Sequence, residues 1–113
     1  MTDLKIIVER LKQLPKNEQV TIKPNKVAFE LAKELIVTFK EINISPRDVV
    51  PLDAGGICFS FNAIRALGTI EVYNNGDVIF SESTEETFVT VPGATNSESV
   101  KKFIKLLKVT RKD

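Results

Sequence analysis

The chain has 113 residues, of which 42% are hydrophobic and 27% are charged. This mixture is typical of a globular protein, and the length suits one hydrophobic core, so we expect a single domain over residues 1–113. The 16 basic residues nearly balance the 15 acidic ones. That balance excludes a whole-molecule field that would attract nucleic acid or anionic lipid, so any electrostatic role must be local.

Cysteine usage and the N-terminal pattern indicate the compartment. Cys58 is the only cysteine, which rules out an intramolecular disulfide and favours a reducing environment. The first residues include Asp3 and have amphipathic spacing, unlike the basic flank and apolar run of a signal peptide. No apolar run approaches the roughly eighteen residues that a membrane-spanning helix needs. We expect a cytoplasmic protein that does not cross a membrane.

The first predicted element is a helix over residues 3–14. Its apolar positions recur at helical spacing: Leu4, Ile7, Val8, Leu11 and Leu14. Thr2 or Asp3 is available as the N-cap, and Pro15 closes the segment. Residues 16–24 are polar and end in a proline. Their partial alternation allows a short edge strand, and otherwise they form an extended linker.

The strongest pattern in the chain predicts a second helix. One apolar stripe contains Ala28, Leu31, Ala32, Leu35, Ile36 and Phe39. Asn25 is the expected N-cap. The helix should end between Glu41 and Asn43, because the residue before Pro46 is pushed out of helical geometry.

A β-rich region begins at Val49. Ile57, Phe59 and Phe61 fall on one face of a predicted strand, whereas Cys58, Ser60 and Asn62 fall on the other. This alternation is typical of a sheet that is covered on one side only. We expect a turn over residues 63–68, followed by strands over residues 69–73 and 77–81.

The loop between those last two strands is predicted from packing. A two-residue turn at Asn75-Gly76 would pair a glutamate with a phenylalanine across the strands. A three-residue loop with a left-handed Gly76 instead sets Val72 opposite Val78 on a common apolar face, so we predict the longer loop. Several glutamates precede residues 87–91, and they leave open whether that segment adds a strand.

The last predicted element is a helix with a capping box. Thr95-Asn96-Ser97-Glu98 has the Thr-x-x-Glu pattern. Val100, Phe103, Ile104 and Leu107 then recur at helical spacing. The predicted fold class is α+β, with two layers: an antiparallel β-meander packed against two N-terminal helices and one C-terminal helix.

Catalytic chemistry finds little support in this composition. Histidine is absent, which removes the commonest general base and metal ligand. Cys58 is a candidate nucleophile, but no basic residue lies nearer in sequence than Arg65, so a packed, inert thiol is the better interpretation. We expect no catalytic residue, no metal site and no cofactor, and therefore a protein that is not an enzyme.

The glycine pair in Asp53-Ala54-Gly55-Gly56 invites comparison with a phosphate-binding loop. Such loops run from a strand into a helix, whereas these glycines run into another strand. A tight turn that needs glycine-only dihedral angles is the better interpretation.

Two surfaces are candidates for binding. Lys101, Lys105, Lys108 and Lys112 share one face of the last predicted helix. Such a stripe can follow phosphates or an acidic protein surface, although cations are also favoured near a helix C-terminus for structural reasons. Tyr73 marks the second surface, on the open side of the sheet.

One resemblance concerns the start of the strand region. The run from Pro51 to Phe61, followed by the hairpin over residues 68–80, resembles small bacterial proteins with a Pro-x-x-Asp-Gly-Gly-Ile strand opening. In that pattern the aspartate abuts the glycine pair, whereas Ala54 intervenes here. The resemblance covers residues 25–81. It implies a similar helix-plus-meander fold and carries no active site across.

These observations favour a non-catalytic protein-binding or regulatory module. An antitoxin-like or accessory subunit that acts with a partner protein is one concrete form. The alternative is a nucleic-acid-binding protein that uses the basic C-terminal helix. The sequence sets neither the identity of the partner nor the oligomeric state.

Overall fold

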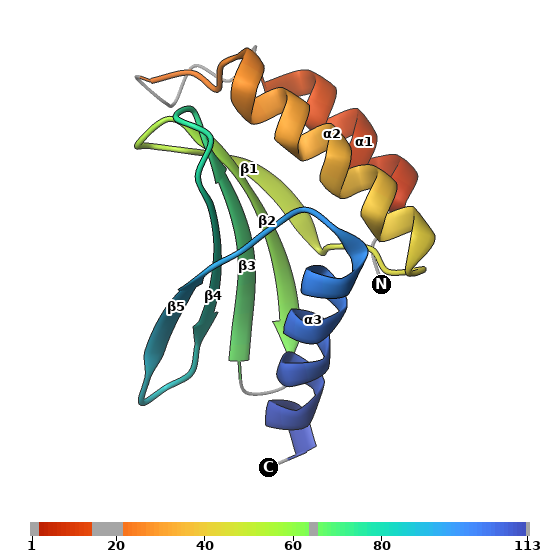
Figure 1. Cartoon of the computed structure of the whole chain (residues 1–113), viewed down its shortest axis with the longest axis vertical. Coiled ribbons are helices and arrows are strands. Elements are labelled where there is room, and N and C mark those ends of the chain that lie inside the picture. Colours follow the sequence, from red (N-terminus) through yellow and green to blue (C-terminus); the bar gives the residue numbers. More distant parts are fainter. Residues whose placement is uncertain (1–2, 15–21, 64–65, 113) are drawn as a thin grey trace.

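The computed structural model describes residues 3–14, 22–63 and 66–112, with side chains described as far as Leu107. Its elements are α1 (Leu4–Gln13), α2 (Lys26–Glu41), β1 (Asp48–Leu52), β2 (Gly56–Ala63), β3 (Ala66–Tyr73), β4 (Val78–Ser83), β5 (Phe88–Pro92) and α3 (Ser97–Lys112). The helices pack against an antiparallel sheet, which confirms the predicted α+β class (Figure 1). No helix in these ranges is long and apolar enough to cross a membrane.

The sheet is a meander in which each strand pairs with the next one in the chain, in the order β1-β2-β3-β4-β5. Its third and fourth strands confirm the predicted three-residue loop, because Val72 lies opposite Val78 and Ile70 opposite Phe80. Gly76 has the left-handed φ of 97° that this loop requires. The register therefore keeps the apolar residues of both strands on one face.

Both N-terminal helices begin where the sequence predicts. The side chain of Asp3 accepts a hydrogen bond from the Lys5 N–H, and that of Asn25 accepts one from the Ala28 N–H. These bonds satisfy backbone donors that a helix start otherwise leaves unpaired. Most of the predicted linker lies outside the described residues, and residues 22–25 carry neither helix nor strand.

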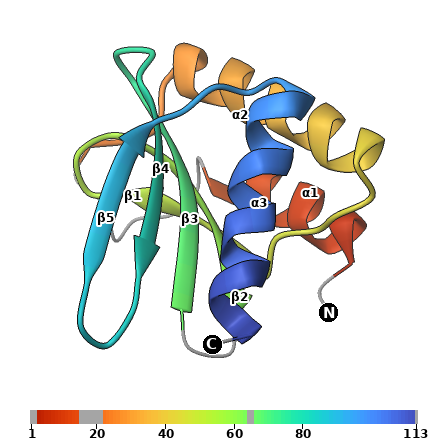
Figure 2. The ribbon, with the colours of Figure 1, turned by 60° about the horizontal axis from the view of Figure 1, so that its bottom comes forward.

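The core lies between the inner face of the sheet and the three helices, which cover that face alone (Figure 2). Phe39 of α2 sits at its centre and is fully buried. Its ring meets Phe59 and Phe61 of β2 edge-on, with centroid distances of 5.3 and 5.6 Å. The predicted one-sided sheet is thus confirmed.

The predicted turn over residues 63–68 is wrong in part. Strand β3 begins at Ala66, so residues 66–68 belong to the sheet, and residues 64 and 65 lie outside the described part. Gly68 looks like a turn residue in the sequence. In the fold it makes room for Leu107, which occupies the space that a Cβ at this position would need.

The predicted capping box at Thr95 is also wrong. Asn96 caps α3, since its side chain accepts a 2.9 Å hydrogen bond from the Ser99 N–H. Thr95 instead faces α2, where its carbonyl accepts the Thr38 hydroxyl and its own hydroxyl donates to Glu34 over 3.3 Å. The contact between helices therefore decides the role of Thr95, and the cap moves by one residue.

The segment that the sequence left open forms a strand. β5 pairs with β4 along its whole length, from Ile79 opposite Pro92 to Ser83 opposite Phe88. All five of its residues are exposed. β5 is thus an edge strand that no described residue covers on its outer side.

Candidate binding groove and sheet surface

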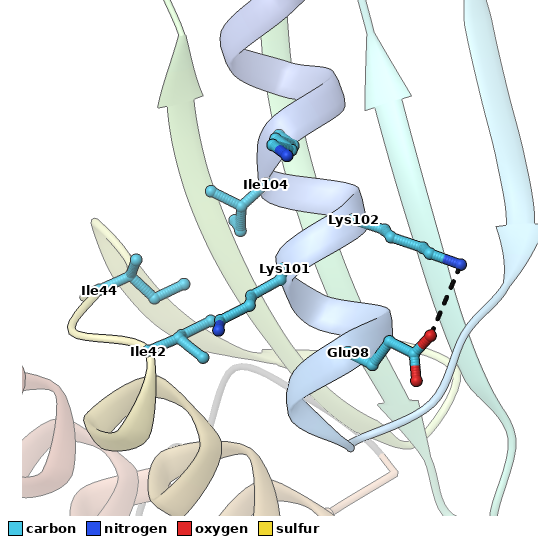
Figure 3. A pocket seen from close by; sticks show the side chains of 7 residues that line it. Ile42, Ile44, Glu98, Lys101, Lys102 and Ile104 are labelled. Carbon is cyan, nitrogen blue, oxygen red and sulfur yellow. Dashed lines mark ion pairs between the residues drawn. The ribbon is translucent and has the colours of Figure 1, made fainter.

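A groove of about 330 Å³ lies between the end of α2 and the outer side of α3. It is lined by Ile42, Ile44, Glu98, Lys101, Lys102, Ile104 and Lys105 (Figure 3). Its floor consists of the three isoleucines, and the charged side chains of α3 form its rim. The groove combines apolar surface with positive charge.

The end of α2 creates this floor. Asn43 adopts a left-handed conformation with φ of 56°, which ends the helix. The Ile44 N–H then reaches back to the Phe39 carbonyl over 3.0 Å. This tight reversal brings Ile42 and Ile44 side by side against the core, and both remain partly exposed.

Lys101 and Lys105 differ from Lys102, the third lysine of the rim, in their ion pairing. Lys102 forms an ion pair of 3.8 Å with Glu98, and both side chains are highly exposed, so this pair adds little stability. Lys101 and Lys105 are exposed one turn apart on α3. Among the described side chains, neither has an ion-pair partner. Their charges are therefore available to an external group.

The structure brings part of the predicted lysine stripe together. Lys101 and Lys105 both line the groove. Lys108 and Lys112 lie in α3, but their side chains are outside the described part of the chain. Sequence reasoning missed Ile42 and Ile44, whose only signal was two apolar residues just past the end of the helical stripe.

Tyr73 lies elsewhere. It alternates with Val72, which is buried on the helix side, so it belongs to the open face of the sheet, away from the lysines. Partial burial, the negative charge of Glu71 and a hydrogen bond to Glu71 raise the pKa of Tyr73. The predicted site residues with described side chains therefore lie on two separate surfaces, Lys101 and Lys105 on the helix side of the sheet and Tyr73 on its open side.

Cys58 is on the same open face, yet it is only 8% exposed. Its neighbour across the ladder is Glu71 of β3, which also accepts a hydrogen bond of 3.4 Å from the buried Ser81 hydroxyl. Burial, and then the negative charges of Glu71 and Asp48, raise the pKa of the Cys58 thiol to about 12. The thiol is protonated at neutral pH and is a weak nucleophile there.

The glycine pair forms the predicted turn. Gly55 and Gly56 have φ angles of 92° and 154°, which residues with a Cβ rarely adopt. The Gly55 N–H donates to the Leu52 carbonyl over 3.1 Å, and its carbonyl accepts from the Asn74 N–H over 3.0 Å. These groups hold the loop together, so the phosphate-loop interpretation gains no support.

The described residues bring no three side chains of the His, Cys, Asp and Glu types close enough to hold a metal ion. Comparison with protein-family models, curated proteins and solved structures gives no match. Among the described surfaces of this chain, the groove between α2 and α3 has the most definite chemistry.

Proposed function

We propose that this protein is a non-catalytic protein-binding module and that the groove between α2 and α3 receives an acidic, partly apolar segment of a partner protein. The observation that supports this proposal is the apolar floor beside Lys101 and Lys105, two lysines with no ion-pair partner among the described side chains. A regulatory or accessory subunit, of the antitoxin-like kind, is the role that such a module would serve.

The groove suits a segment in which aspartates or glutamates flank an apolar side chain. The isoleucines would bury that apolar side chain, which supplies affinity roughly in proportion to the area removed from water. The lysines would steer the acidic residues and fix their position. An amphipathic helix laid into a groove is the common form of this recognition.

Binding to nucleic acid through the same lysines is the alternative. The phosphate backbone needs a line of cations and makes little use of an apolar floor. The three isoleucines of the floor therefore favour the acidic, partly apolar protein segment.

The test is affinity capture from the native host, followed by binding measurements with the captured partner and with acidic peptides derived from it. The double variant Lys101→Glu/Lys105→Glu should lower the affinity at least about tenfold, because attraction becomes repulsion at both rim positions. The matched control is Lys5→Glu/Lys33→Glu, which makes the same charge change at exposed positions outside the groove and should bind as the parent does.

Two results would contradict this proposal. The first is a partner that binds the parent chain and the Lys101→Glu/Lys105→Glu variant equally well. The second is nucleic acid without a stoichiometric protein, lost by about 0.3 M salt, which would favour the alternative.

A further inference from the structure

The free edge of β5 is unusually open for an edge strand. The side chains of Phe88, Val89 and Val91 are 69%, 52% and 46% exposed. Edge strands commonly carry charged residues or proline that discourage pairing with another chain. The sequence Phe-Val-Thr-Val-Pro of β5 contains no charge, and its one proline is the last residue of the strand. This edge therefore has the features of a strand that pairs.

The hydrogen-bond alternation of the sheet fixes which residues face outward. Bonds of 2.8 Å at the two ends of the β4–β5 ladder run from the Gly93 N–H to the Val78 carbonyl and from the Thr84 N–H to the Thr87 carbonyl. Because antiparallel ladders alternate, Val89 and Val91 direct their backbone groups at β4. Phe88, Thr90 and Pro92 direct theirs away from the sheet, so the missing N–H of Pro92 costs the β4–β5 ladder no bond.

We propose that this edge pairs with the same edge of a second copy, antiparallel and centred on Thr90. Two sheets would then join into one around a two-fold axis. Thr90 of each copy would exchange both backbone hydrogen bonds with Thr90 of the other. The Phe88 N–H would donate to the second copy's Pro92 carbonyl, whereas the Phe88 carbonyl would receive no bond in return, because Pro92 has no N–H. This register overlaps the whole of β5 with itself.

The side chains of β5 are self-complementary in this register. Val89 would lie opposite the second copy's Val91 on the helix side, and Phe88 opposite the second copy's Pro92 on the open side. Such β-branched and aromatic pairs stabilise neighbouring strands. Charge also agrees, because no residue of β5 is charged, so the paired strands bring no like charges together.

The same two-fold axis would bring apolar side chains of both copies together beside the paired β5 strands. A two-fold axis perpendicular to the sheet keeps both sets of helices on one side. Phe103 of α3 stacks on Phe80 of β4 at 4.9 Å, and Leu106, one turn further along this side of α3, is 65% exposed. β4 and β5 extend past α3 (Figure 2), so Leu106, Val89 and Val91 of both copies would line one shared trough.

Cysteine cross-linking tests the register. In the proposed pairing the two Thr90 residues are directly opposite, about 5.5 Å apart, so Thr90→Cys should form a disulfide-linked dimer under mild oxidation. The two Phe88 residues would be about 14 Å apart along the strands, so Phe88→Cys should not cross-link. The parent chain controls for Cys58, which is buried. Equal cross-linking of both variants, or of neither, would overturn the register.

Amide hydrogen exchange on the unmodified chain, with molar mass by light scattering at each concentration, tests the pairing itself. The Phe88 and Thr90 amides should become protected at least about tenfold as concentration rises and the mass doubles. The Val89 and Val91 amides should be protected throughout, since they bond to β4. A mass that stays monomeric at millimolar concentration, with fast exchange at Thr90, would overturn the proposal.

Discussion

Cys58 shows how an environment outside the main core changes a residue's chemistry. Strand alternation correctly placed it on the face opposite Ile57 and Phe59. The sequence did not reveal that this face is partly closed, because the closure depends on which strands lie beside β2. Val50 of β1 and Glu71 of β3 flank the thiol. Burial, and then the negative charges of Glu71 and Asp48, make the thiolate unfavourable.

The first prediction concerns pH. The pKa of Cys58 is raised from 9.0 to about 12 in the folded chain. A raised pKa means that the native state holds the proton more tightly than the unfolded state, so the free energy of unfolding is unaffected below pH 9 and falls as pH rises towards 12. The slope from this residue should reach about 1.4 kcal/mol per pH unit. Urea titrations between pH 8 and pH 11 measure it.

Cys58→Ala is the matched variant for this measurement. In this variant the free energy of unfolding should fall less steeply with rising pH, because the contribution of the thiol is absent. The contribution of Tyr73, whose pKa is also raised, should remain at higher pH. Alkylation of native Cys58 at pH 7 should accordingly be much slower than that of the unfolded chain. Rapid alkylation of the native thiol would contradict the pKa assignment.

Among the elements, α3 shows most clearly what can and cannot be predicted locally. Its apolar spacing predicted the buried residues Val100, Phe103 and Leu107 correctly. Its N-cap was predicted one residue too early, because Thr95 bonds to Thr38 of α2, which lies 57 residues away in sequence and so outside any local pattern. The groove was missed for the same reason, since it forms only where the end of α2 meets α3.

Gly68 positions α3 on the sheet and gives a second prediction. A Cβ at this position would meet the side chain of Leu107. Gly68→Ala should therefore lower the free energy of unfolding by about 1–3 kcal/mol, the usual cost of overpacking. Chemical denaturation measures the change. Leu67→Ala, at the exposed neighbouring position in the same strand, is the control and should stay within about 0.5 kcal/mol of the parent.

A double-mutant cycle separates this contact from a general effect on β3. Leu107→Ala alone should cost about 2–5 kcal/mol, because it leaves a cavity. In the double variant, the methyl group of Gly68→Ala would occupy part of that cavity. The loss of unfolding free energy in the double variant should therefore be smaller than the sum of the losses in the two single variants. Strict additivity would mean that Gly68 does not set the distance between α3 and the sheet.

At the scale of the whole molecule, the predicted α+β class and the meander order of the strands agree with the structure, because both follow from clear local patterns in the sequence. The alternation of β2, the apolar stripe of α2 and the three-residue loop at Gly76 each restrict the possible arrangements. These patterns do not show which apolar residues the helices leave exposed. Val89 and Val91 have the sequence of a buried strand, yet β5 lies beyond the area that the helices cover.

Phe39 provides the prediction for the core as a whole. It is fully buried and contacts two aromatic rings of β2. Phe39→Ala should lower the free energy of unfolding by about 3–5 kcal/mol, measured by urea denaturation. Val37→Ala changes a 57% exposed position on the same helix and should stay within about 0.5 kcal/mol of the parent. Similar losses for both variants would mean that α2 contributes through helix formation and not through the core.

The meander order also determines how the chain closes on itself during folding. Strands that pair with their sequence neighbours close short loops, which costs little entropy. The bonds that attach α2 are different, since Asn25 meets Asn74 across 49 residues and Thr38 meets Thr95 across 57. Sequence-local contacts thus build the sheet, while distant ones dock the helix. The contacts of the helices therefore raise the contact order of this protein above that of the meander alone, which favours slower folding.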